Sequence, residues 1–143
     1  MRPPPGTVLT PIERERIDAT IRETCSASLM SDTKWRKLFA ALAAIPSIKT
    51  YYLKSLRKPD EVRGFGSFGL QTPHEFVDTP SFGPIYLREI EWIEFPRVER
   101  RAAGSDDLHQ DIDSLQHALA AAGDFPIEET ARGLRIVGHI RAT

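Results

Sequence analysis

Apolar residues recur at helical spacing near the start of the chain. Thr10-Pro11-Ile12-Glu13 reads as a capping box with proline at the first helical position, which predicts that a helix begins there. Apolar residues then recur every four positions and form a narrow stripe. These residues are Ile17, Ile21, Cys25 and Leu29. On this stripe Cys25 is expected to be a small buried hydrophobic residue rather than a reactive thiol.

A second helix is predicted from Ser31 or Asp32, which are both good N-cap residues. It ends before Pro46, because the residue that precedes a proline avoids the helical backbone conformation. Its apolar positions follow the i, i+3, i+4, i+7 pattern of a helix with one buried face. They are Trp35, Leu38, Phe39, Leu42 and Ile45.

A third helix is predicted in the last third of the chain. Ser105 or Asp106 caps its N-terminus, and Gly123 supplies the stop at its C-terminus. Its apolar residues keep helical spacing and would face the core. They are Leu108, Ile112, Leu115, Leu119 and Ala122.

The remaining segments favour β-structure. Residues 85–95 are rich in β-branched and aromatic residues and form the strongest predicted strand, while residues 48–57 and 134–140 are also predicted strands. Residues 59–84 are punctuated by glycine and proline, so they can hold only short strands joined by turns.

This order of elements, α-α-β-(β)-β-α-β, predicts the fold class. We expect a single α+β domain at residues 10–143, with a mostly antiparallel sheet and helices packed on one face. Residues 1–9 are proline-rich and are expected to form a flexible N-terminus.

Composition narrows the class of protein. The chain has 143 residues and a formal net charge of -1, which excludes a uniformly basic nucleic-acid binder and a disordered polyelectrolyte. The single cysteine excludes an internal disulfide and a cysteine-based zinc site. Neither a signal peptide nor an apolar run long enough to cross a bilayer is seen, so a cytoplasmic protein without membrane contact is expected.

Two motifs suggest ligands but have simpler explanations. Residues 64–69 match the dinucleotide fingerprint G-x-G-x-x-G, but the residues that follow cannot begin the long helix which that site needs. A glycine-rich hairpin or loop is the preferred interpretation. His109, Asp113 and His117 have i, i+4, i+8 spacing on the predicted third helix, yet a metal site needs further convergent ligands. We therefore expect a solvated face there, with no metal and no cofactor.

Carboxylates on the strongest strand raise the possibility of an enzyme. Glu89 and Glu91 would share one face of that strand, and with His74 or His139 in a pocket they could carry out acid–base chemistry. A solvent-facing sheet surface explains the same residues more simply. No catalytic residue is therefore assigned.

Charge is unevenly distributed along the chain. Residues 1–58 have a balance of +6, residues 59–104 of -3 and residues 105–143 of -4. If the third helix packs beside the strand, the acidic side chains of both would form one patch that binds a partner. They are Glu89, Glu91, Asp106, Asp107, Asp111 and Asp113.

Aromatic residues outside the helical stripes are candidate anchors for the same partner. They are Tyr51, Tyr52, Phe65 and Phe68. Nucleic-acid binding through the basic N-terminal half is a less favoured alternative. Its candidate residues are Lys34, Arg36, Lys37, Lys49, Lys54, Arg57 and Lys58.

Three segments carry a family resemblance that would cover residues 12–141. They are Asp32 to Phe39, Leu87 to Ile93 and Arg135 to Ile140. These segments resemble a family of small bacterial proteins filed as a domain of unknown function. Its members often show Asn-Thr-Lys-Trp-Arg, Ile-Glu-Trp and a closing Ile-x-Gly-Tyr strand, so the chain departs from the pattern at Asp32 and His139.

The resemblance implies a type of protein rather than an activity. Small bacterial proteins of this build are similar to immunity proteins, which neutralise secreted toxins by protein–protein contact. The expectation is therefore a non-enzymatic binding protein whose partner is a cognate toxin. On the motif segments themselves, Trp35 and Trp92 are expected to be core anchors.

Overall fold

The computed structural model describes the backbone of six parts of the chain, residues 10–45, 47–58, 60–65, 76–79, 83–100 and 103–142, with side chains omitted at 63–65, 76–79 and 83–84. The helices in these parts are α1 (Pro11–Thr24), α2 (Asp32–Ala43) and α3 (Ile112–Ala122), with a 3₁₀ turn η1 (Leu87–Glu89). The strands are β1 (Cys25–Ser28), β2 (Thr50–Ser55), β3 (Val62–Phe65), β4 (Phe76–Thr79), β5 (Gly83–Tyr86), β6 (Ile90–Pro96), β7 (Val98–Glu99), β8 (Leu108–His109), β9 (Ile127–Glu129), β10 (Gly133–Val137) and β11 (His139–Arg141).

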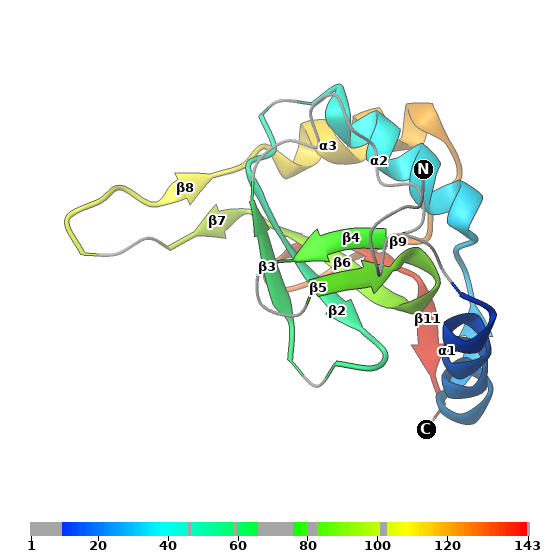
Figure 1. Cartoon of the computed structure of the whole chain (residues 1–143). Coiled ribbons are helices and arrows are strands. Elements are labelled where there is room, and N and C mark those ends of the chain that lie inside the picture. Colours follow the sequence, from blue (N-terminus) through cyan, green and yellow to red (C-terminus); the bar gives the residue numbers. More distant parts are fainter. Residues whose placement is uncertain are drawn as a thin grey trace, which may run out of the picture.

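An antiparallel sheet of five strands, in the order β3-β2-β6-β10-β9, forms the centre of the molecule. Its register places Tyr52 opposite Glu94 and Glu94 opposite Arg135. Helices α2 and α3 lie side by side over the sheet, whereas α1 lies beside β11 (Figure 1). Three two-stranded ladders complete the fold, namely β1 with β11, β4 with β5 and β7 with β8. The predicted α+β class with a mostly antiparallel sheet is confirmed.

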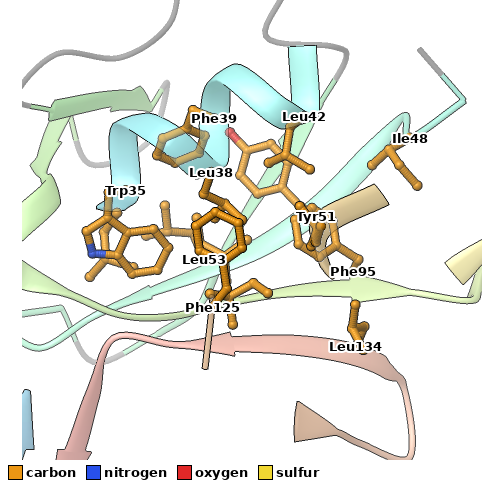
Figure 2. Packing of buried hydrophobic residues seen from close by; sticks show 14 of the residues in the cluster. Trp35, Leu38, Phe39, Leu42, Ile48, Tyr51, Leu53, Phe95, Phe125 and Leu134 are labelled. Atoms are coloured by element: carbon orange, nitrogen blue, oxygen red, sulfur yellow. The ribbon is translucent and has the colours of Figure 1, made fainter. Parts of the chain in front are cut away.

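The core lies between α2, α3 and the sheet. Trp35, Leu38, Phe39 and Leu42 of α2 point toward β2 and β6, as Figure 2 shows for the labelled residues. The Trp35 and Phe39 rings stack with their centroids 6.2 Å apart. Since burying a large apolar side chain stabilises by about 1.5–3 kcal/mol, this helix face contributes much of the driving force for folding.

Helix α2 forms as the sequence predicts, because Ser31 accepts a hydrogen bond from the backbone N–H of Lys34 at 3.1 Å. The first helix begins as predicted, with the Thr10 hydroxyl accepting from the Glu13 N–H. It ends at Thr24, however, so the prediction of an apolar helical stripe reaching Leu29 is wrong.

The end of α1 is decided by strand pairing. Residues 25–28 form β1, in which Ala27 lies opposite Ile140 of β11. Pairing with a distant strand satisfies the backbone hydrogen-bonding groups that a longer helix would have satisfied locally. Cys25 is therefore half-buried on a strand instead of lying on a helical stripe.

The strand predicted at residues 85–95 is interrupted by η1. Glu89 turns its carboxylate back to accept a hydrogen bond from the Tyr86 N–H at 3.1 Å, which closes the 3₁₀ turn between β5 and β6. The strand predicted at 134–140 is likewise divided, at Gly138. A Cβ at Gly138 would collide with the carbonyl oxygen of Ile90 and lie 2.8 Å from Cζ2 of Trp35, so only glycine allows the chain to pass so close to β6.

The third helix begins at Ile112, seven residues after Ser105 and six after Asp106, the two predicted caps. Asp111 caps it instead, with a side-chain oxygen 3.0 Å from the Ser114 backbone nitrogen. Leu108 and His109, which were expected to be helical, form β8 and pair with β7. This hairpin extends away from the sheet (Figure 1), and Gly104 within it adopts a φ of 92°.

Candidate functional site

An open surface cavity in the described part of the chain has a volume of about 660 Å³. It lies where α1, β1, the N-terminus of α2, η1 and β11 meet. Small-molecule sites typically have volumes of about 300–1,000 Å³, so the cavity, hereafter the basic pocket, is large enough for a small ligand. Its cationic lining residues are Arg14, Lys34, Arg36 and Arg88.

The sequence builds this pocket around the turn between β1 and α2. The Leu29 N–H donates to the Gly138 carbonyl at 2.8 Å, which holds the turn against the end of β10. Trp35 is fully buried, so it anchors the first turn of α2 while Lys34 and Arg36 on either side of it line the pocket. The helix N-terminus adds a partial positive charge to this end of the cavity.

His139 forms part of the pocket wall and joins two of its elements. Its Nε2 lies 2.7 Å from the carbonyl oxygen of Arg88, which can only accept, so Nε2 carries the proton. Nδ1 lies 2.8 Å from Oγ of Ser28, and the hydroxyl donates to it when the imidazole is neutral. Burial lowers the pKa of His139 below its ordinary value of 6.5, so the neutral ring is the favoured form at neutral pH.

Two of the cations that line the pocket form no ion pair within the described residues, namely Arg14 and Lys34. Arg88 is paired with Asp18, with the shorter nitrogen–oxygen distance 2.6 Å, and Arg36 donates to the Thr33 hydroxyl at 3.2 Å. Most other arginines with described side chains pair with a carboxylate. They are Arg16, Arg22, Arg57, Arg97, Arg132, Arg135 and Arg141.

The predicted acidic patch is not a single surface. Glu89 is fully buried in an ion pair with Arg57, and Glu91 pairs with Arg141 at 2.8 Å on the main sheet. Because η1 turns the chain between them, the two carboxylates do not lie in one strand. The prediction that Glu89 and Glu91 share one exposed face is therefore wrong, and His74, which the catalytic alternative placed beside them, lies outside the described residues.

The other four predicted acidic residues are exposed, and one of them, Asp113 of α3, pairs with Arg97 at 3.4 Å. Asp106 and Asp107 lie in the hairpin that carries β7 and β8, and Asp111 caps α3 at its base. Hydrogen bonds from the Ser114 hydroxyl and backbone N–H lower the pKa of Asp111. We call Asp106, Asp107 and Asp111 the acidic hairpin surface.

The aromatic anchor candidates occupy different environments. Tyr51 is buried beside Phe95, and burial raises its pKa to about 12, so it is a core residue and not a surface anchor. Tyr52 is half-buried and its hydroxyl donates to the Glu99 carboxylate at 2.7 Å, while the Arg132 guanidinium lies over its ring. The side chain of Phe65 and the whole of Phe68 lie outside the described residues.

The three residues with metal-ligand spacing, His109, Asp113 and His117, do not lie on one helix. His109 lies in β8, whereas Asp113 and His117 lie in α3. Among the residues that the structure describes, no group of three or more histidine, cysteine, aspartate or glutamate side chains converges. Within the same residues, no helix combines the length and apolar character needed to cross a bilayer.

The basic residues of the N-terminal half are divided among several sites. Lys34 and Arg36 line the pocket, whereas Lys54 lies 3.9 Å from Glu91 and Arg57 pairs with Glu13 and Glu89. Local spacing could not show that Arg14, Arg88 and His139 meet Lys34. The only sequence signal was indirect, because Lys34, Arg36 and His139 belong to the segments that carried the family resemblance.

A family model matches residues 17–143, which include all of the pocket lining except Arg14. The chain belongs to DUF6678, a family of unknown function. The match begins within α1 and covers every strand of the main sheet. Searches of curated proteins and of solved structures found no further match to this DUF6678 member.

Proposed function

We propose that this protein is a non-enzymatic binding protein that neutralises a bacterial toxin by direct contact in the cytoplasm. The observation that carries the proposal is the projecting hairpin of β7 and β8, with exposed Asp106 and Asp107, and Asp111 at its base. A projecting hairpin can enter a groove of a partner, and its acidic residues complement a basic groove such as that of a nucleic-acid-cleaving toxin.

Hydrogen bonds hold the base of the hairpin to the domain, and this favours a role of the hairpin in binding a partner. Gln110 is buried at its base and bonds to the backbone of β2 and β6, and Glu99 of β7 accepts the Tyr52 hydroxyl. An element that is already held at its base loses less conformational entropy when a complex immobilises it.

The first experiment is co-expression with the toxin or secretion effector encoded beside the gene. The wild-type protein is expected to restore growth and to co-purify with that toxin as a stable complex. Failure to restore growth, together with no complex in gel filtration, would overturn the proposal.

The second experiment tests the acidic hairpin surface in that complex. Charge reversal by Asp106→Lys with Asp107→Lys is expected to slow association about ten-fold and to reduce its salt dependence. The matched control is Glu23→Lys with Glu129→Lys, which makes the same change in net charge at two other exposed residues. Equal association rates for both double variants would place the contact elsewhere.

A further inference from the structure

We propose that the basic pocket binds a small organic phosphate monoester. The inference is independent of toxin neutralisation, since the pocket lies between α1, α2 and β11 rather than on the β7–β8 hairpin. Three features carry it, namely the charge of the lining, the hydrogen-bonding groups at its polar end and an apolar wall.

The charge of the lining matches a phosphate monoester. The Arg88 guanidinium is neutralised by Asp18, which leaves Arg14, Lys34 and Arg36 against the single carboxylate of Asp32. The pocket thus holds about two excess positive charges, and a phosphate monoester carries about -1.5 to -2 at neutral pH. A ligand with one carboxylate would compensate only half of this excess.

The absence of internal partners for two cations strengthens the argument. Other arginines of this chain, such as Arg57 and Arg135, pair with carboxylates. Within the described residues, Arg14 and Lys34 have no carboxylate within 4.0 Å, although both face the same cavity. Arginine offers a planar fork of donors that suits phosphate oxygens, and lysine adds a point charge.

Neutral donors surround these charges. Thr33 lines the cavity, and its hydroxyl accepts from Arg36 and so keeps its own proton to donate. The N-terminus of the twelve-residue helix α2 faces the cavity as well. Backbone N–H groups and the dipole at a helix N-terminus favour a phosphate group.

The remaining wall is apolar. Ile21, Leu29 and Met30 line it, and Leu29 is a large hydrophobic residue that keeps 37% of its surface exposed. Inorganic phosphate would leave this wall in water, whereas the apolar body of an organic phosphate would cover it. Burial of apolar surface contributes about 25 cal/mol for each Å², so an organic ester should bind more tightly than the free anion.

Calorimetric titration with three matched probes tests the proposal. They are phenyl phosphate, inorganic phosphate and benzoate, which separate the phosphate from the apolar ring. We expect phenyl phosphate to bind with at least about ten-fold higher affinity than either of the others. No saturable binding of phenyl phosphate up to about 10 mM, or equal affinity for benzoate, would overturn the proposal.

Two variants locate the site. Arg14→Gln with Lys34→Gln is expected to weaken phenyl phosphate binding at least about ten-fold. The matched control, Lys49→Gln with Arg100→Gln, removes two exposed cations that do not line the pocket and is expected to bind like the wild type. An equal loss of affinity for phenyl phosphate in both double variants would mean non-specific electrostatic attraction and would overturn the assignment of the site.

A third variant tests the apolar wall. Leu29→Ser leaves every cation in place, and because Leu29 is partly exposed the fold should tolerate the change. The variant is expected to lose most of the preference for phenyl phosphate over inorganic phosphate. An unchanged preference would overturn the assignment of an organic phosphate, and NMR shifts of the α2 amides on titration would report whether the anion still binds.

Discussion

The side-chain amide of Gln110 forms two hydrogen bonds with the backbone of Thr50, one in each direction. Oε1 accepts from the Thr50 N–H at 3.0 Å, and Nε2 donates to the Thr50 carbonyl at 3.1 Å. The same amide accepts from the Lys49 N–H at 2.7 Å and donates to the Pro96 carbonyl at 2.8 Å. One buried side chain therefore replaces strand pairing at the place where the hairpin leaves the sheet.

Gln110→Ala should lower the free energy of unfolding by about 2–4 kcal/mol, because several buried backbone groups lose their partner together. Gln110→Glu should also destabilise, since a carboxylate cannot donate to the two carbonyls. Urea unfolding followed by circular dichroism measures both. Gln116→Ala on α3 is the control, and a similar loss there would show that the Gln110 network is not the cause.

Replacing Arg57 and replacing Glu89, the two partners of a buried ion pair, should lower the free energy of unfolding by unequal amounts. Arg57→Leu leaves a fully buried carboxylate uncompensated and should cost about 3–5 kcal/mol of unfolding free energy. Glu89→Leu also removes the acceptor of the Tyr86 N–H, but it should cost less, because Arg57 is partly exposed and keeps its contact with Glu13 at 3.0 Å.

A double-mutant cycle with both substitutions measures this asymmetry. The double variant should be more stable than Arg57→Leu alone, since no buried charge then remains. Glu15→Gln, in the exposed pair with Arg22, provides the control and should leave stability at the wild-type level. Equal costs for the two single variants would contradict the prediction.

His139 should make stability depend on pH. Burial lowers its pKa in the folded state below 6.5, so as the pH falls the unfolded chain takes up the proton first. The contribution of His139 is therefore fully present above about pH 6.5 and decreases as the pH falls toward the lowered pKa.

The measurement compares urea unfolding of the wild type and of His139→Asn across this pH range. The variant keeps a polar side chain but cannot titrate, so its stability should fall less steeply on acidification. Parallel stability curves for the two proteins would show that His139 is not the titrating group.

Gly138→Ala should destabilise the fold by about 3 kcal/mol or more. The new Cβ would meet the Ile90 carbonyl and the Trp35 ring, and the Gly138 N–H is held by the Glu91 carbonyl at 2.7 Å, so the backbone cannot move away. Gly104→Ala meets no neighbouring atom and is strained only by its φ of 92°, so it should cost about 1–2 kcal/mol. Thermal unfolding of both variants tests this difference, and an equal loss would contradict it.

Several elements of the fold could be predicted from the sequence because the signals lie within a few residues. The Ser31 cap and the apolar spacing of α2 depend on contacts one helical turn apart, and β2 follows the β-propensity of its tyrosines. The end of α1 and the start of α3 could not be predicted, because helical spacing continues through residues 25–28 and 108–109 that pair as strands instead.

By itself, the sequence determined the α+β class, the buried face of α2 and the resemblance to a family of unknown function, since these depend on local spacing and motifs. Only the tertiary structure decided that Glu89 and Tyr51 are buried and that Arg14, Lys34 and His139 line one pocket. The physical reason is the distance of the partners along the chain. Ser28 meets His139 across 111 positions and Arg57 meets Glu89 across 32, and no local periodicity records such contacts.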